Sequence, residues 1–279
     1  KITGYTKRFV EACDNNGCMI HGTINQSVTM THRLSSSNPN QQNIDRTLKK
    51  LFNSRNEGWK IRSNDYRQLE YRVAGILAQD KEVLRVIQAN EDVHQFTADT
   101  LTSAGQPTSR QDAKEHTFKP LYGGTSGTRA EQTYYKTFKE KYSAITEMQE
   151  RWVYEVLDTG KYRISSGLVL YFPDTKIMNS GYISNNESIK NYPVQGIATG
   201  DIAPIGAVCL WYRFKSLNLN SFIINIVHDS VENEEDPNES ELIGNLVEQA
   251  LSKDIVPYFK QCYNLDLNFP LEVESKLSN

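Results

Sequence analysis

A strand-like run that ends in an acidic residue and passes into a helix occupies residues 59–70, which read WKIRSNDYRQLE. Apolar residues then recur at helical spacing from Leu69 onward. A carboxylate such as Asp65 at a strand end can hold a hard cation through oxygen, and the adjacent backbone carbonyl can supply a second ligand. The alternative is that Asp65 only caps the following helix.

A second acid lies at the tip of a predicted β-hairpin. SFIINIV at 221–227 and VENEE at 231–235 flank the polar turn His228, Asp229 and Ser230. Taken alone, Asp229 fits an ordinary turn aspartate. Two strand-end carboxylates brought together would repel unless cations lay between them. A two-metal phosphoryl-transfer site needs such a pair, with ions roughly 3.5–4 Å apart.

A third pattern repeats at every fourth residue, at Arg110, Lys114, Phe118 and Tyr122. On a helix, steps of four advance only about 40° each and span about 18 Å here, so these side chains would line one face. Two cations at one end can hold a triphosphate, while two aromatics at the other stack on a base. The alternative is a solvated basic helix with two core aromatics.

The rest of the chain predicts helices between short strands, with no internal repeat. A strand pair is expected at 19–30 and is followed by a polar loop at 31–46. Short strands and turns are expected at 161–184, and a last short strand at 270–274. Helices are expected at 68–90, 108–122, 129–157, 192–214 and 239–263, the second capped by Thr108 or Ser109 and the fourth following Pro193 and kinked at Pro204. Because helices separate strands that lie far apart in sequence, the pattern favours an α+β fold.

Five segments in chain order resemble the motifs of family A DNA polymerases, the family of bacterial polymerase I and the phage replicases. They are THRLSSSNPNQQNI at 31–44, DYRQLEYR at 65–72, RQDAKEHTFKPLYG at 110–123, NYPVQG at 191–196 and VHD at 227–229. Each motif alone is moderately specific, but the combination covers nearly the whole chain.

The resemblance implies a right-hand polymerase with an antiparallel palm sheet and helical fingers. Residues 1–80 would be the end of the thumb and the first part of the palm, 81–186 the fingers, and 187–279 the second part of the palm. The implied reaction is template-directed addition of dNTPs to a primer 3′-OH. Two Mg²⁺ ions would be held by Asp65, Asp229 and the Tyr66 carbonyl.

The resemblance also implies contacts with substrate and DNA. Arg110 and Lys114 would grip phosphates, Lys114 also giving a proton to the leaving pyrophosphate, and Glu70 would crowd out a ribose 2′-hydroxyl. The implied dNTP-binding residues are Gln68, Glu70, His94, Arg110, Lys114, Phe118 and Tyr122. The implied contacts with the primer–template backbone or minor groove, which are largely blind to sequence, are Arg33, Asn40, Gln42, Asn43, Asn191, Gln195 and His228.

Four positions depart from the family pattern. Ser230 stands where many relatives have a second acid, which predicts altered metal tuning with activity retained. Pro120 removes a backbone donor and predicts a kink before Tyr122. His32 replaces a common Gly, and Glu187 stands where relatives often carry Arg, which puts one phosphate contact in doubt.

The first residues match only the end of the thumb, so most of the thumb and any proofreading exonuclease are expected from a longer natural protein or from a partner subunit. The charge is uneven: up to residue 62, ten basic residues face four acids, whereas from Asp229 onward twelve acids face three lysines. The basic N-terminal part could follow phosphates.

No apolar run approaches the roughly 20 residues of a membrane helix, so no membrane association is expected. The four cysteines (Cys13, Cys18, Cys209 and Cys262) show no zinc-like spacing and are expected to be unpaired thiols. The expected location is the cytoplasm of a bacterial or phage-infected cell, or an organelle.

Two other functions remain open. A single-subunit RNA polymerase of the phage type shares a similar palm and a His-Asp-Ser turn, but Glu70 and the spacing of Gln68 argue against it. A catalytically silent DNA-binding polymerase subunit would fit the missing thumb and Ser230, but would not need both acids and the whole nucleotide helix.

Overall fold

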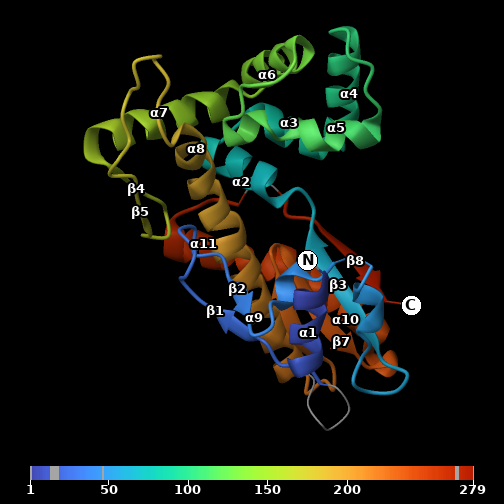
Figure 1. The fold of residues 1–279 in the computed structure, drawn as a ribbon. Helices are drawn as coiled ribbons and strands as arrows, with labels where there is room; N and C mark the ends of the chain where they lie inside the picture. The colour runs from blue at the N-terminus through green and yellow to red at the C-terminus, as the bar shows by residue number, and fades with distance from the viewer. Residues whose placement is uncertain (1, 13–18, 46, 268–269, 279) are drawn as a thin grey trace. The chain divides into compact units, whose positions relative to one another are not determined.

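The computed structural model describes residues 2–12, 19–45, 47–267 and 270–278. The chain forms two compact units. Unit 1 comprises residues 1–67, 198–258 and 271–279, and unit 2 comprises residues 68–197 and 259–270. Figure 1 labels the helices and strands of both units.

The centre of unit 1 is a four-stranded antiparallel sheet in the order β6-β7-β3-β8. Its strands are β3 (Lys60–Tyr66), β6 (Phe222–Val227), β7 (Ser230–Glu235) and β8 (Val273–Leu277). The predicted hairpin is confirmed as β6 and β7. The last strand begins at Val273, later than the predicted start at residue 270, because only from there does the chain pair with β3.

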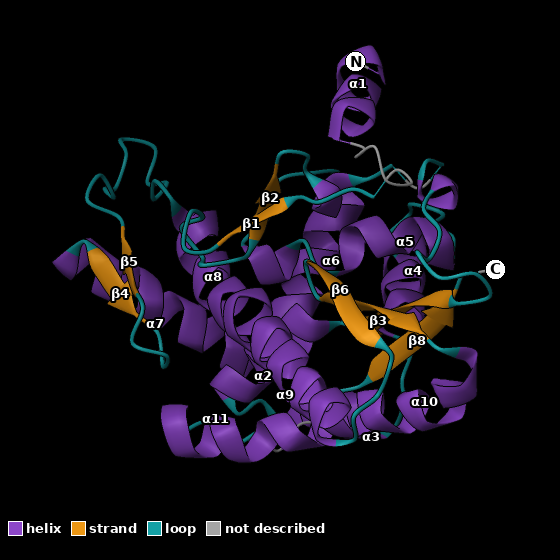
Figure 2. Ribbon diagram, turned by 90° about the horizontal axis from the view of Figure 1, so that it is seen from below, coloured by secondary structure: helices purple, strands orange, loops and turns teal. Residues whose placement is uncertain are grey.

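One face of this sheet is buried by helices. Asn64, Val231 and Asn233 are fully buried, and α9 (Ala203–Ser216) contacts β6 and β7. Figure 2 labels β6, β3 and β8 of this sheet, in which β7 lies between β6 and β3, and it also labels α10 (Ser240–Glu248). The backbone of α9 comes so close that a Cβ at Gly206 would lie 2.5 Å from the Tyr66 hydroxyl oxygen.

A buried ion pair fastens this face to α10. Arg62 donates to both carboxylate oxygens of Glu235, one at 3.0 Å, and to the Ser240 carbonyl at 3.3 Å. Because successive residues of a strand point to opposite faces, the neighbours Ser63 and Asp65 lie on the other side, which is more open to solvent.

The remainder of unit 1 is built from short elements. They are α1 (Ile2–Ala12), β1 (Thr23–Asn25), β2 (Ser35–Ser37), the 3-10 turns η1 (Gln41–Asn43), η2 (Lys49–Leu51) and η5 (Pro237–Glu239), and the π turn η6 (Gln249–Asp254). The prediction of a strand pair within 19–30 is wrong, because β1 pairs with β2 from the predicted polar loop. The predicted helix 239–263 is present in three parts, as α10, η6 and α11 (Ile255–Tyr263).

Unit 2 is mainly helical. Its elements are α2 (Leu69–Ala78), α3 (Lys81–Gln88), α4 (Val93–Ser103), α5 (Arg110–Thr117), η3 (Pro120–Tyr122), α6 (Arg129–Lys141), α7 (Ser143–Thr159), β4 (Lys161–Arg163), β5 (Val169–Tyr171) and α8 (Asn186–Gln195). Two predicted helices are each divided. The first breaks where Gln79 adopts φ 51° and Asp80 caps α3, and the second breaks at Tyr142. The helices pack around the buried side chains of Leu69, Tyr71, Leu101 and Tyr134. With antiparallel strands in one unit and packed helices in the other, the α+β prediction is confirmed.

The helical stretch Asn186–Ser216 consists of α8, the π turn η4 (Gly196–Ile202) and α9. It begins before Pro193, not after it as predicted. An 18-residue window of this stretch has a mean hydropathy of 1.2, so by length and composition it could cross a membrane, and the expectation that no segment approaches that length is too strong. Of that window 56% is buried, as in the core helix of a water-soluble fold.

Cys209 and Cys262 are free thiols, as expected. Cys13 and Cys18 lie outside the described residues.

Candidate functional site: a carboxylate pair and a helical cation–aromatic set

The structure brings Asp65 and Asp229 together in unit 1. Asp65 is the second-last residue of β3 and pairs in register with Ser230, the first residue of β7. Asp229 lies in the tight β6–β7 turn, and its carbonyl oxygen accepts a hydrogen bond of 3.1 Å from the Tyr66 amide. Backbone hydrogen bonds therefore fix the end of β3, which carries Asp65, beside the turn that carries Asp229.

The electrostatics of the pair favour a cation. The pKa of Asp65 is raised, first because its carboxylate is partly removed from water and then because of the negative charge of Asp229. Carboxylate and carbonyl oxygens are the ligands that Mg²⁺ prefers, so the donor set fits this ion. Among the described residues, no group of three or more His, Cys, Asp or Glu side chains is arranged to hold a metal. An ion would thus rest on two carboxylates and a backbone oxygen.

His228, which precedes Asp229 in the turn, contacts the guanidinium group of Arg33. His228 adopts φ 57°, and a guanidinium nitrogen of Arg33 lies 3.0 Å from its Nδ1. Because Arg can only donate, Nδ1 must accept and the ring is neutral. The pKa of His228 is lowered by burial and then by the charges of Arg33 and Lys49. Two residues predicted to touch DNA are therefore in contact with each other.

Residues 38–43, which read NPNQQN, contain the 3-10 turn η1. Asn40 caps this turn by accepting from the Gln42 amide at 3.0 Å, and the Gln42 side chain donates to the Ile226 carbonyl at 2.8 Å. Gln42 thus connects this segment to β6, Asn40 stabilises the turn itself, and Asn43 is the last residue of the turn.

Ser230 faces Ser63 across β3 and β7, with 3.0 Å between the two hydroxyl oxygens. Ser230 is 8% exposed. At this position, which differs from the family pattern, the buried hydroxyl is therefore hydrogen-bonded to Ser63.

In unit 2, the predicted face of four side chains is divided by a change of helix type. Arg110 and Lys114 are exposed on α5, which is capped by Ser109 as predicted. Phe118 ends that helix, and Tyr122 lies in the following 3-10 turn. The prediction of one continuous α-helical face is wrong, and the predicted break before Tyr122 is confirmed, because Pro120 begins the new turn.

Hydrogen bonds and ring contacts hold the first part of this set. Arg110 pairs with Asp92, whose carboxylate also caps α4 by accepting from the His94 amide at 3.0 Å. His94 Nδ1 lies 2.9 Å from the Thr117 hydroxyl. The Phe118 ring contacts His94 at 5.7 Å and Tyr71 at 5.5 Å between centroids. His94 and Phe118 therefore lie side by side, and Phe118 follows Lys114 by four residues.

Two hollows lie in unit 2. A pocket of about 320 Å³ is lined by Lys119, Tyr122, Gly124, Glu187, Ser188, Asn191 and Tyr192. It brings Tyr122 and Asn191 together, and the buried Oδ1 of Asn191 has no hydrogen-bond partner in the described structure. The pocket therefore joins a residue predicted to bind the nucleotide with one predicted to contact DNA.

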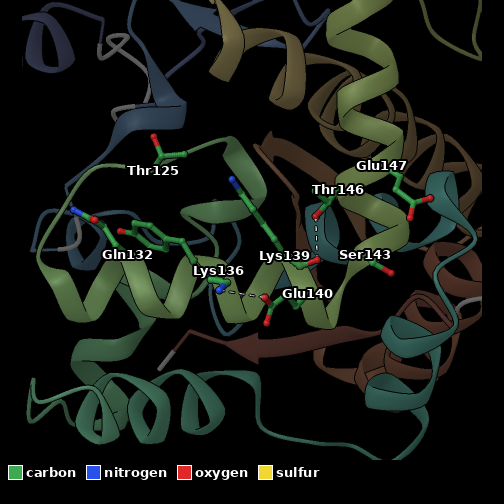
Figure 3. A pocket seen from close by; sticks show the side chains of 9 residues that line it. Thr125, Gln132, Lys136, Lys139, Glu140, Ser143, Thr146 and Glu147 are labelled. Carbon is green, nitrogen blue, oxygen red and sulfur yellow. Dashed lines mark hydrogen bonds and ion pairs between the residues drawn. The ribbon is translucent and has the colours of Figure 1, made fainter. Parts of the chain in front are cut away.

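The other hollow, of about 530 Å³, lies along α6 and α7 (Figure 3) and contains none of the predicted residues. Lys136 and Lys139 there are matched by Glu140 and Glu147, and Lys136 pairs with Glu140 at 3.8 Å. Its volume exceeds that of the first hollow, but it offers neither a net charge nor a predicted functional side chain.

The other predicted residues lie on nearby elements. Gln68, with φ 51°, precedes α2, and Glu70 is in the first turn of that helix. Gln195 is the last residue of α8. Sequence reasoning missed Glu274, which faces Asp65 across β3 and β8, and Asp92 as the partner of Arg110. Only the register of β8 could have identified Glu274, whereas Asp92 lies just two residues before His94, which the sequence had already singled out.

Comparison with known proteins agrees with this geometry. The chain is 31% identical over 278 residues to the thermostable DNA polymerase I of Thermus filiformis, a match that covers 91% of this chain and 31% of that protein. It is 29% identical over 293 residues to DNA polymerase I of Pseudomonas aeruginosa, covering 97% of this chain and again 31% of the relative. The chain thus spans about a third of the length of these curated relatives.

The fold matches that of a solved polymerase domain. The polymerase domain of Pol1 from M. smegmatis, in complex with DNA primer-template and dNTP, superposes with a TM-score of 0.80 at 24% identity and covers 100% of this chain and 50% of that chain. The expected polymerase-type α+β fold is therefore confirmed. The model of "DNA polymerase family A" matches residues 1–279, and the chain accordingly belongs to DNA polymerase family A.

Proposed function

We propose that this chain carries the polymerase centre of a template-directed DNA polymerase, which adds dNTPs to a primer 3′-OH. The observation that carries the proposal is the backbone hydrogen bond from Tyr66 to Asp229, which holds the turn that carries Asp229 beside the end of β3 that carries Asp65. The carboxylate pair alone would serve many phosphoryl-transfer enzymes. Family membership and the names of the relatives, DNA polymerase I, favour DNA synthesis.

In this proposal, Asp65, Asp229 and the Tyr66 carbonyl would hold two Mg²⁺ ions. When bound, such ions would make the attacking hydroxyl more acidic and neutralise charge on the attacking and leaving oxygens. The rest of unit 1 keeps the carboxylates in place: the buried Tyr66 side chain donates to the Leu251 carbonyl at 2.8 Å, and Ser63 and Ser230 share a hydrogen bond between them.

Unit 2 is proposed to hold the nucleotide. Arg110 and Lys114 are exposed on α5 and would bind the triphosphate by charge-assisted hydrogen bonds, while Lys114 would also donate a proton to pyrophosphate. Arg110 must then exchange Asp92 for a phosphate. His94, Phe118, Tyr122, Gln68 and Glu70 complete the proposed nucleotide set, with Glu70 excluding the 2′-hydroxyl.

The proposed DNA contacts come from both units. They are Arg33, Asn40, Gln42, Asn43 and His228 in unit 1, and Asn191 and Gln195 in unit 2. The sheet of unit 1 supports a palm within residues 1–80, which would also include the end of the thumb, and within 187–279, and the helices of unit 2 support a fingers assignment for 81–186. A cytoplasmic site of action in a bacterium or phage-infected cell is proposed from the bacterial relatives.

Primer extension tests the proposal. The protein is mixed with a labelled primer–template and either dNTPs or NTPs, with and without Mg²⁺. Extension with dNTPs that requires Mg²⁺ and is lost in Asp65→Asn supports it. Preferential use of NTPs would indicate an RNA polymerase instead, and DNA binding without extension would indicate a silent subunit.

A further inference from the structure

Lys276 lies on the same side of the sheet as the carboxylate pair. β8 is fastened to β3 at its end, where the Ser278 amide donates to the Ile61 carbonyl at 2.7 Å and the Ile61 amide donates to the Ser278 hydroxyl at 2.9 Å. The resulting register sets Lys276 opposite Ser63 and Glu274 opposite Asp65. Because directly paired residues share a face, Lys276 is the diagonal neighbour of Asp65.

Lys276 is also the more available of two cations near the pair. Lys49 is engaged with Glu232 at 3.6 Å. Lys276 is exposed and forms no ion pair with any residue in the described part of the chain. The charge of Lys276 acts on Asp65 more strongly than that of Lys49 does.

We propose that Lys276 is an internal counter-ion of the metal-binding carboxylates and sets the Mg²⁺ concentration at which the site fills. This inference rests on the proposed role of Asp65 and Asp229 as metal ligands. In the metal-free protein, the ammonium offsets the repulsion between the two acids. When divalent cations bind, the same fixed charge repels them, so a higher concentration of metal is needed.

The expected size follows from Coulomb's law. A unit charge at roughly 7 Å from a divalent ion, in water at low salt, changes the metal affinity by about two- to fivefold. Removal of the charge should tighten binding, and salt should abolish the effect.

The test uses Mn²⁺ as a spectroscopic probe, with free Mn²⁺ counted by electron paramagnetic resonance at pH 8 without DNA, in about 20 mM and about 0.5 M salt. Lys276→Gln should bind Mn²⁺ about two- to fivefold more tightly than wild type at low salt and equally at high salt. Lys276→Arg should restore the wild-type affinity. Lys60→Gln is the matched control, since Lys60 lies at the other end of β3, opposite Glu235, and its loss should change nothing.

The outcomes separate the two claims. If wild type binds Mn²⁺ and Asp229→Asn does not, the metal site stands, and an unchanged or weaker affinity in Lys276→Gln then overturns the counter-ion alone. If wild type and Asp229→Asn are equally unable to bind, both claims fail. A tighter Lys276→Gln whose advantage persists at high salt would also overturn the proposal, because the effect would then not be electrostatic.

Discussion

Replacing Asp229 by Asn should remove metal binding and at the same time make the metal-free protein slightly more stable. Asn keeps the size of the side chain, and the hydrogen bond that positions the turn uses the backbone carbonyl of residue 229. What changes is the negative charge that raises the pKa of Asp65. Without that repulsion, the folded state is favoured.

The magnitude is small because Asp65 is exposed to solvent. At roughly 6–8 Å, the spacing of neighbouring residues on adjacent strands, repulsion in a largely aqueous setting is about 0.5–1 kcal/mol. Salt and solvent reduce it to about 0.3–0.7 kcal/mol. For a chain of 279 residues, this raises Tm by roughly 1 °C.

Metal should reverse the order of stability. A ligand that binds only the folded state at ten times its Kd stabilises by about 1.4 kcal/mol. Wild type should gain this amount from saturating Mg²⁺, and Asp229→Asn should gain little. The variant is therefore expected to melt above wild type in EDTA and below it in Mg²⁺.

The direction in which stability changes with pH provides a second check. An acid whose pKa is raised on folding binds protons more tightly in the folded state, so its contribution to stability falls as pH rises from the ordinary Asp value, about 4, through the raised value. Asp229→Asn should weaken this loss. Thermal melting from pH 4 to 8, with and without Mg²⁺, measures both effects.

Asp174→Asn is the control, since that carboxylate is exposed in a turn and makes no hydrogen bond within the described structure. A variant that is less stable than wild type in EDTA by more than about 1 kcal/mol, or that gains as much from Mg²⁺ as wild type, would refute the reasoning.

Three further substitutions test the site. Phe118→Tyr should relax the rejection of dideoxynucleotides, because a hydroxyl there can replace the missing 3′-OH. The ratio of ddNTP to dNTP incorporation efficiency should rise by about 5- to 150-fold. An unchanged ratio would show that Phe118 does not lie next to the sugar. Glu70→Ala should admit ribonucleotides more readily while weakening normal extension, which the kcat/KM ratio for dCTP and rCTP measures; a constant ratio contradicts it. Ser230→Ala should keep much of the extension activity and lose about 0.5–1.5 kcal/mol of stability, the worth of its hydrogen bond to Ser63, and complete inactivity would show that the hydroxyl has a chemical role.

The sequence predicted those elements whose signals are local. The hairpin around Asp229 has an apolar strand, a polar turn and a short return strand, and the cap at Ser109 and the break at Pro120 follow from the chemistry of single residues. The division at Gln79 was missed because apolar spacing continues across it, although Asp80 has the side chain of a helix cap. β2 was missed because a run of three serines has no strand pattern and forms only against β1.

The sequence pointed to the two acids and the cation–aromatic segment of the candidate site, but it did not predict the change of helix type within that segment or the residues around the acids. The approach of Glu274 and Lys276 to Asp65 depends on a register between strands more than 200 residues apart in sequence. The pairing of His228 with Arg33 joins residues separated by 195 positions. Such contacts come from tertiary packing, to which neither periodicity nor motif spacing is sensitive.

The two-sided character of β3 also determines which genetic changes the strand can tolerate. Ser63 and Asp65 face the open side, while Arg62 and Asn64 face the packed side, where they bond to Glu235 and Asn233. Substitutions on the open side can therefore alter chemistry while the fold survives. A single-residue insertion or deletion between Lys60 and Asp65 would instead turn every following side chain to the opposite face, placing the carboxylate in the helix-packed layer and the asparagine amide in water. Length variation in this strand should consequently be lethal to folding and catalysis together, and a library of insertions scanned across 60–66 should contain no active clones.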